Sequence, residues 1–216
     1  MRTSVAQKHR GIVRRILSCS RGVAMVEMAF VMPILLLMIF GGLELTQMAM
    51  THMRLNQIAI AVADNAGRVR TGIDESNIYE VFAGADLMGN SFSFKENGRI
   101  VLSSLEPNGK TGADAGQMIN WQRCYGELNV APRYGVQGDG ADDASLVDGL
   151  GAEGNKIQSA ENTAVMFVEV TYNYTPLVSG IPGWGPQQIR YESAFNVRER
   201  TNQDITNVQG LAVNSC

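Results

Sequence analysis

The chain has 216 residues, of which 45% are hydrophobic and 18% charged, and its formal net charge at pH 7 is −3. That balance is sufficient to bury a core, so it excludes a wholly disordered chain. The sequence holds two histidines, His9 and His52, which leaves the region after residue 52 without one for a catalytic triad or a zinc site. We therefore expect a protein that is not an enzyme and has no cofactor or metal.

The charges are distributed unevenly along the chain. Residues 1–22 hold six basic residues and no acidic one, so all 21 Asp and Glu lie in the remainder. A basic arm on an acidic body is one pattern of nucleic-acid binding. The apolar segment that follows favours a membrane instead. We expect residues 1–22 to form a basic cytoplasmic leader, and we expect no nucleic-acid partner.

The run Val23–Leu45 is apolar apart from Glu27 and Glu44. As a helix with its flanking turns it covers about 30 Å, the thickness of a bilayer core. Cations on its N-terminal side place the N-terminus in the cytoplasm and the rest of the chain outside. We predict a single-pass transmembrane helix over 23–45, in a bacterial inner membrane. The alternatives are a buried helix of a soluble domain and a cleaved secretory signal, although Phe40–Glu44 lacks the A-x-A pattern of signal cleavage.

A finer pattern begins just before the apolar run. Gly22 precedes the apolar Val23, and Glu27 is the fifth residue after the glycine, which resembles the processing site of type IV prepilins. The wider stretch 21–47 resembles the TadE family of Tad (Flp) pilus-assembly proteins. The residues that carry the resemblance are Gly22, Glu27, Ala29, Phe30, Pro33, Leu35, Leu36, Leu37, Phe40, Gly41 and Glu44.

This resemblance implies a minor pilin-like, or pseudopilin-like, subunit of a Tad pilus machine. A prepilin peptidase would cut between Gly22 and Val23. The implied partners are the membrane, other pilin-like subunits (a TadF-like protein and the major Flp pilin), the peptidase and the inner-membrane assembly platform. Glu27 would serve assembly by pairing with the amine that cleavage creates at Val23, in the same subunit or in a neighbour. The alternative is that Glu27 only stabilises its own helix N-terminus.

The helical pattern continues beyond the apolar run. No Gly or Pro interrupts residues 45–66, so we predict one long helix from about Ala24 to Ala66. A second helix is predicted over Asp74–Met88, with Asp74 and Glu75 in its first turn.

The remaining pattern is that of strands and loops. Ser91–Lys95 and Arg99–Ser103 flank Asn97-Gly98, which predicts a β-hairpin. Residues 106–160 predict a loop-rich insertion with a short helix around Gln117–Gln122. Ala164–Tyr174 and Gln188–Arg200 predict strands, joined by a loop at Gly180–Pro186. We expect an α+β fold, in which residues 46–216 form a periplasmic pilin-like domain with a helix extension (46–66) and an antiparallel sheet of about four strands.

Cysteine usage agrees with this topology. Cys19 lies in the leader, which leaves Cys124 and Cys216 as an even pair in an oxidising compartment. We predict a disulfide between them, with two free thiols as the alternative. The acidic residues Asp139, Asp142, Asp143 and Asp148 lack the spacing of a calcium loop, so we expect a solvated acidic loop there.

Two functional hypotheses follow from different classes. The first is the structural subunit for Tad pilus assembly, processed by a prepilin peptidase. The second is a membrane-anchored periplasmic binding or adhesion domain that is never processed. A mature N-terminus at Val23 favours the first hypothesis, and a retained leader favours the second.

Overall fold

The computed structural model describes residues 20–178 and 185–216. The leader up to residue 19 and most of the predicted loop Gly180–Pro186 therefore lie outside the described residues. The chain divides into two compact units, Met1–Gln47 and Met48–Cys216. Helix α2 (Ser20–Gly67) begins in the first unit and ends in the second. It starts four residues before the predicted position and continues through Pro33, so the long helix is confirmed.

The first unit consists, among its described residues, of the apolar half of α2. Every side chain from residue 22 to 40 is exposed. By length and composition, this is one helix that can cross a membrane, which indicates single-pass anchoring.

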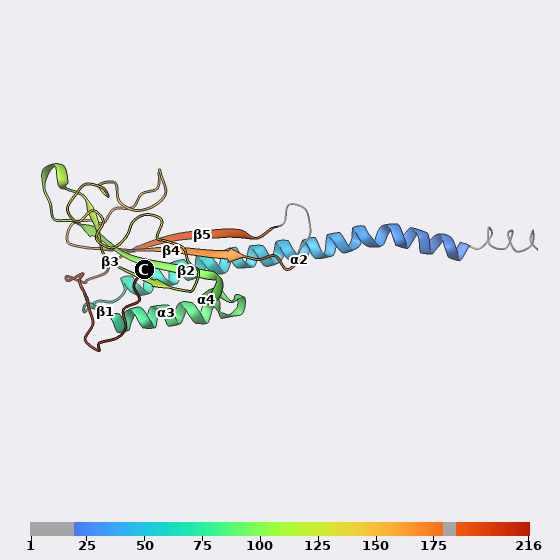
Figure 1. The fold of residues 1–216 in the computed structure, drawn as a ribbon, viewed down its shortest axis with the longest axis horizontal. Coiled ribbons are helices and arrows are strands. Elements are labelled where there is room, and N and C mark those ends of the chain that lie inside the picture. The colour runs from blue at the N-terminus through green and yellow to red at the C-terminus, as the bar shows by residue number, and fades with distance from the viewer. Residues whose placement is uncertain (1–19, 179–184) are drawn as a thin grey trace, which may run out of the picture. The chain divides into compact units, whose positions relative to one another are not determined.

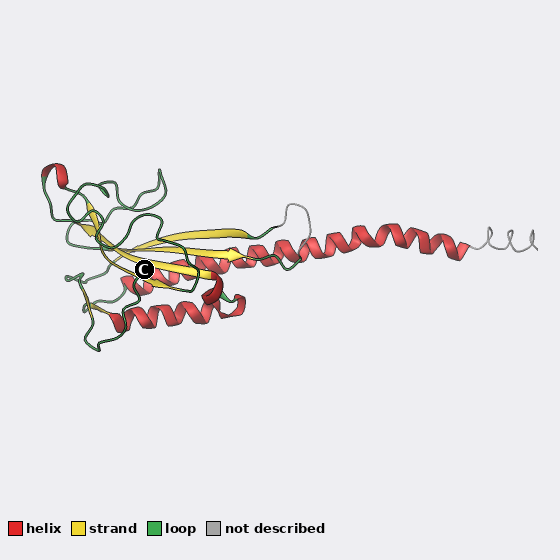
Figure 2. Cartoon of the chain, viewed as in Figure 1, coloured by secondary structure: helices red, strands yellow, loops and turns green. Residues whose placement is uncertain are grey.

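The second unit contains the remaining elements (Figures 1 and 2). In chain order they are β1 (Ile73–Asp74), α3 (Glu75–Gly89), η1 (Asn90–Phe92), α4 (Phe94–Asn97), β2 (Gly98–Pro107), η2 (Gly112–Asp114), β3 (Gln117–Tyr125), β4 (Val165–Tyr174), β5 (Gln187–Asn196) and β6 (Ile205–Thr206). The second helix begins one residue after the predicted start, because Asp74 is its N-cap: the Asp74 side chain accepts from the Ser76 N–H at 3.0 Å, and the Asn77 side chain accepts from the Asp74 N–H at 3.0 Å. These reciprocal bonds form a capping box.

Strands β2 to β5 form one antiparallel sheet in the order β3-β2-β4-β5. A separate parallel pair joins β1 to β6. This helix-plus-sheet arrangement confirms the predicted α+β class with a four-stranded antiparallel sheet.

Alternation along the strands gives the sheet two buried faces. On one face, even-numbered residues of β4 such as Met166 and Val168 pack with α2 and α3, and the α2 residues recur at helical spacing. The α2 contributors are Leu55, Ile58, Ala59, Val62, Ala63 and Ala66. On the other face, Val165 and Phe167 form a smaller cluster with Leu150 and with Tyr134. The latter two residues belong to the irregular segment 126–163, so a loop rather than a helix covers this face.

The predicted hairpin is wrong. Residues 94–97 form the helical turn α4, and Ser93 has a left-handed backbone with φ 51°. Phe94 is completely buried, and a Cβ on Gly98 would lie 2.5 Å from its ring. Both edges of β2 are occupied by β3 and β4, so no edge is left for a strand at 91–95.

Two smaller expectations also need correction. Gln117–Gln122 lies in strand β3 and is not a helix; Ile119 and Trp121 are both buried in the sheet. The last long strand ends at Asn196 rather than Arg200, because the next residues turn towards the end of α2, where the Arg198 N–H donates to the Gly67 carbonyl.

Candidate functional site

The predicted processing site lies in the first turn of α2. Helix α2 begins at Ser20, so the Gly22–Val23 bond is helical here. A protease needs an extended backbone, and a glycine weakens a helix by about 1 kcal/mol relative to alanine. Gly22 therefore makes this turn easier to unwind. Packing does not require a glycine at this position, because a Cβ there would meet nothing within 4 Å.

Glu27 is the one acidic residue between Gly22 and Leu43. Its side chain is exposed, like those around it. Glu27 is four residues from Val23, so both lie on one side of the helix, about 6 Å apart along the axis. The second carboxylate of the apolar run, Glu44, differs because it is 1% exposed.

The two cysteines outside the leader meet across 92 residues. Cys124 of β3 and Cys216 form a disulfide in the structure, with Cα atoms 5.0 Å apart. The Cys124 N–H also donates to the Asn214 carbonyl at 2.8 Å. The last residues therefore lie along the outer edge of β3.

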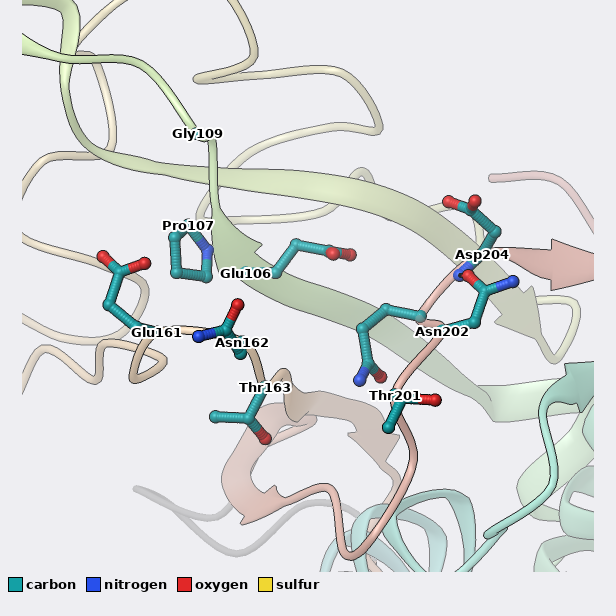
Figure 3. A pocket seen from close by; sticks show the side chains of 10 residues that line it. Glu106, Pro107, Gly109, Glu161, Asn162, Thr163, Thr201, Asn202 and Asp204 are labelled. Atoms are coloured by element: carbon teal, nitrogen blue, oxygen red, sulfur yellow. Dashed lines mark hydrogen bonds between the residues drawn. The ribbon is translucent and has the colours of Figure 1, made fainter.

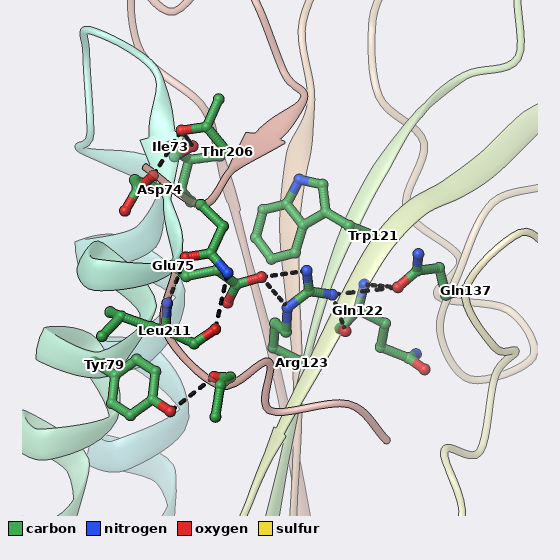
Figure 4. A network of polar contacts seen from close by, with 12 residues as sticks. Ile73, Asp74, Glu75, Tyr79, Trp121, Gln122, Arg123, Gln137, Thr206 and Leu211 are labelled. Carbon is green, nitrogen blue, oxygen red and sulfur yellow. Dashed lines mark hydrogen bonds and ion pairs between the residues drawn. The ribbon is translucent and has the colours of Figure 1, made fainter. Parts of the chain in front are cut away.

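A buried ion pair, which the sequence did not predict, lies beside this disulfide. The Arg123 guanidinium donates through Nε to Glu75 Oε1 at 2.8 Å, and through Nη2 to the same oxygen (Figure 4). The Arg123 and Glu75 side chains are 8% and 2% exposed. Arg123 Nη1 also donates to the side chain of Gln137, in the segment that covers the other face of the sheet. The network thus connects the start of α3, the strand β3 and that segment.

Segment 205–216 is held against β1 and α3 by further polar contacts. The Val208 N–H donates to Asp74 Oδ2 at 2.9 Å, and the Thr206 hydroxyl donates to the same atom at 2.8 Å. The Val208 N–H, then that of Ser76, lower the pKa of Asp74 to about 2. The Tyr79 hydroxyl donates to the Ala212 carbonyl at 2.7 Å (Figure 4). This segment is therefore an ordered part of the domain.

A polar pocket of about 370 Å³ lies elsewhere on the domain. Glu106 of β2 lies between segments 161–163 and 201–204 (Figure 3). Burial raises the pKa of the Glu106 carboxyl. Over residues 20–178 and 185–216 no group of three or more His, Cys, Asp or Glu side chains is arranged to hold a metal.

Each of the four carboxylates of the acidic loop has a partner of its own. Lys110 pairs with Asp142 at 3.0 Å, and Lys156 pairs with Asp148 at 3.3 Å. Asp139 and Asp143 accept backbone N–H groups of their own turns at 2.8 and 2.9 Å. These acids point to separate partners and do not converge.

The described residues define a class of protein: one apolar helix, long enough for a membrane, that continues into an α+β domain. Residues 22–64 match the family model described as TadE-like protein, which confirms the resemblance read from the sequence. That match indicates a protein associated with a Tad pilus system. No curated protein and no solved structure matches the chain.

Proposed function

We propose that this protein is a minor pilin-like structural subunit for assembly of a Tad (Flp) type IV pilus. The observation that carries the proposal is the exposed apolar half of α2 with Glu27 in it, within the segment that matches the TadE-like model. Its partners would be a TadF-like protein, the major Flp pilin and the inner-membrane assembly platform.

The proposed topology is a single pass through the inner membrane, with residues 1–22 in the cytoplasm and the domain in the periplasm. The six cations before the apolar run support this orientation. A reporter that is active only outside the cytoplasm, fused after Cys216, is expected to be active. Activity of a cytoplasmic reporter at that position would reverse the orientation.

We propose that a prepilin peptidase removes the leader between Gly22 and Val23. Cleavage would lower the mass by about 2.5 kDa, the share of 22 residues at a typical residue mass. Intact-mass measurement in cells with and without the peptidase tests this step. A mass that is the same in both strains would favour the alternative, an unprocessed anchored binding or adhesion domain.

The chemistry proposed for Glu27 follows from that cleavage. A carboxylate in hydrocarbon costs up to about 3 kcal/mol at the bilayer centre, so it needs a partner. The amine created at Val23 would be a cation, since its reference pKa is about 7.7–8.0. The Val23 amine of a neighbouring helix could pair with Glu27 in place of the Val23 amine of the same subunit. A pair between two helices would fix the register of one helix against the other.

The experiment compares Glu27→Ala with Glu80→Ala, which removes an exposed carboxylate from α3. We expect Glu27→Ala to keep its membrane level and cleavage but to reduce pilus formation, while Glu80→Ala assembles normally. Full pilus formation by Glu27→Ala would contradict the proposal. Loss of the Glu27→Ala protein itself would contradict the assembly role and assign Glu27 to stability.

The Cys124–Cys216 bond belongs to the same proposal, because disulfides persist in the periplasm and not in the cytoplasm. Peptide mapping of the exported protein without reductant should recover the two peptides as one linked species. Two free thiols after export would contradict this part of the proposal.

A further inference from the structure

A second cavity, of about 400 Å³, lies on the loop-covered face of the sheet. Arg99 and Gln122, from the neighbouring strands β2 and β3, form its floor. Residues 129–132 and 136–137 form its walls, and Cys216 lies at one side. The volume is within the range of small-molecule sites in proteins.

Arg99 is the only ionisable side chain among the residues that line this cavity. Its Nη1 donates to the Gly126 carbonyl at 2.9 Å, while its Nε is buried without a partner in the described parts of the chain. It also forms no ion pair with any described residue. A guanidinium has five N–H donors, so most of this one's capacity is unused. Leaving a buried donor unsatisfied is unfavourable, which makes the group ready to take an acceptor.

One amide among the residues that line the cavity, that of Gln137, keeps a free N–H donor. Gln137 Oε1 already accepts from the Gln122 N–H and from Arg123, each at 3.2 Å. The amide nitrogen of Gln137 makes no hydrogen bond with a described residue. Gln122 uses its own amide nitrogen on Ser103 Oγ and on the Gly135 carbonyl. Arg99 and Gln137 therefore both have N–H donors to offer, and no acidic side chain of a described residue lines the cavity.

The frame around Arg99 is held in place by the backbone. Gly126 has φ 101°, and a Cβ there would lie 2.2 Å from the Gly98 carbonyl oxygen, so only glycine fits. The Glu127 N–H donates to the Lys95 carbonyl at 2.7 Å, and the Leu128 N–H donates to that of Gly98 at 3.2 Å. At the far end of the wall, the Arg133 N–H donates to Glu169 at 3.0 Å. The cavity is thus built from anchored segments.

We propose that this cavity binds a carboxylate attached to a small apolar group, with Arg99 pairing the carboxylate and Gln137 donating to it. The planar guanidinium matches a carboxylate with two parallel hydrogen bonds. Val130, Ala131, Pro132 and Val136 supply an apolar wall for the group that carries the carboxylate. This chemistry is shared by a free short-chain acid and by the chain end of a peptide. The proposal is independent of the role in pilus assembly.

The test uses the full chain in detergent micelles and saturation-transfer NMR, with empty micelles as the blank. The probes are N-acetylvaline, its uncharged amide N-acetylvalinamide, and the peptide acetyl-Ala-Ala-Val with a free carboxylate. We expect the acid to bind and the amide to bind at least about tenfold more weakly, the loss of one charge-assisted pair. Binding of the peptide as well would identify a chain end as the ligand, and binding of N-acetylvaline alone would identify a free acid.

Arg99→Gln is expected to weaken binding of the acid by about tenfold or more. Arg190→Gln, on β5 and outside the cavity, is the matched control and should leave binding unchanged. Ala131→Trp fills the cavity from an exposed position, so it should abolish binding even if Arg99→Gln does not fold. Equal binding of acid and amide, equal binding by Ala131→Trp, or no binding by the wild type would each overturn the proposal.

Discussion

The two halves of α2 are both rich in apolar residues, yet their environments are opposite. Ile34 is 63% exposed, whereas Ile58, further along the same helix, is 0% exposed. The second half has an apolar stripe that packs on the sheet, while the first half is apolar all round. A helix that is apolar on every side requires an apolar environment on every side. Every side chain from residue 22 to 40 is exposed, in keeping with the single-pass membrane anchoring that the length and composition of the helix indicate.

The largest expected difference in stability is between variants that remove a carboxylate from each of the two regions. Glu75→Ala leaves the buried Arg123 without its carboxylate partner, so we expect the free energy of unfolding to fall by about 3–5 kcal/mol. Glu27→Ala should leave it unchanged, because Glu27 is exposed in the first unit. Chemical unfolding of both variants in micelles measures the difference. Equal stabilities would mean that the Glu75–Arg123 pair does not hold the domain together.

One isoleucine from each half of α2 tests whether only the second half stabilises the domain. Ile58→Ala leaves a cavity against the sheet and should lower the free energy of unfolding by about 2–5 kcal/mol. Ile34→Ala should leave the unfolding of the domain unchanged. The same chemical denaturation series detects both effects. A comparable loss for Ile34→Ala would show that the domain depends on the first half of α2.

Removal of the disulfide should affect only the domain. The double variant Cys124→Ser/Cys216→Ser frees a loop spanning 92 positions, and disulfides of this kind typically contribute about 2–4 kcal/mol. Cys19→Ser is the control and should have no effect on unfolding. Hydrogen exchange should show the greatest loss of protection in segment 205–216. Unchanged protection there would contradict the anchoring role of Cys216.

The smallest expected effect is a dependence on pH that belongs to the domain. Burial raises the pKa of Glu169 from 4.5 to about 6. The hydrogen bond from the Arg133 N–H lowers this pKa, and the negative charge of Glu192, its cross-strand neighbour on β5, raises it. The folded state therefore favours the protonated carboxyl. Protonation of Glu169 stabilises the fold fully below pH 4.5, and this contribution is lost as the pH rises through about 6.

Glu169→Gln mimics the protonated form and should remove this dependence. We expect the stability of the variant relative to the wild type to increase by up to about 2 kcal/mol between pH 4.5 and 7. Thermal unfolding across that range measures it, and Glu80→Gln should follow the wild type. A constant difference over the range would show that Glu169 titrates normally.

The elements that were predicted correctly have local causes. The long helix has no breaker between residues 45 and 66, and Asp74 caps α3 through bonds to residues two and three positions away. The hairpin failed because Asn97-Gly98 is a local signal, whereas the burial of Phe94 and the pairing of β2 with β4 are not. Residues 117–122 were predicted as a helix although they pair with the preceding strand β2; the alternation of the buried Ile119 and Trp121 is too short a pattern to indicate a strand by itself.

The same reasoning explains what was missed at the candidate sites. Glu75 and Arg123 are 48 residues apart, and nothing near either one indicates the other. The pairing of β1 with β6 involves two residues on each side, too few for a recognisable pattern. The cysteines could be paired only because two remained outside the leader. Gly22 and Glu27 were found through family resemblance, since the roles proposed for them depend on a peptidase and a neighbouring subunit.

The central claim is that the apolar half of α2 contacts other pilin-like subunits. Site-specific photo-crosslinking in pilus-producing cells tests it most directly, with the crosslinker at Leu37 or, as a control, at Leu87 of α3. Both side chains are exposed, at 59% and 79%. We predict adducts with pilin-like subunits from position 37, identified by mass spectrometry and reduced by Glu27→Ala, and none from position 87. Adducts from position 87 without any from position 37 would contradict the account.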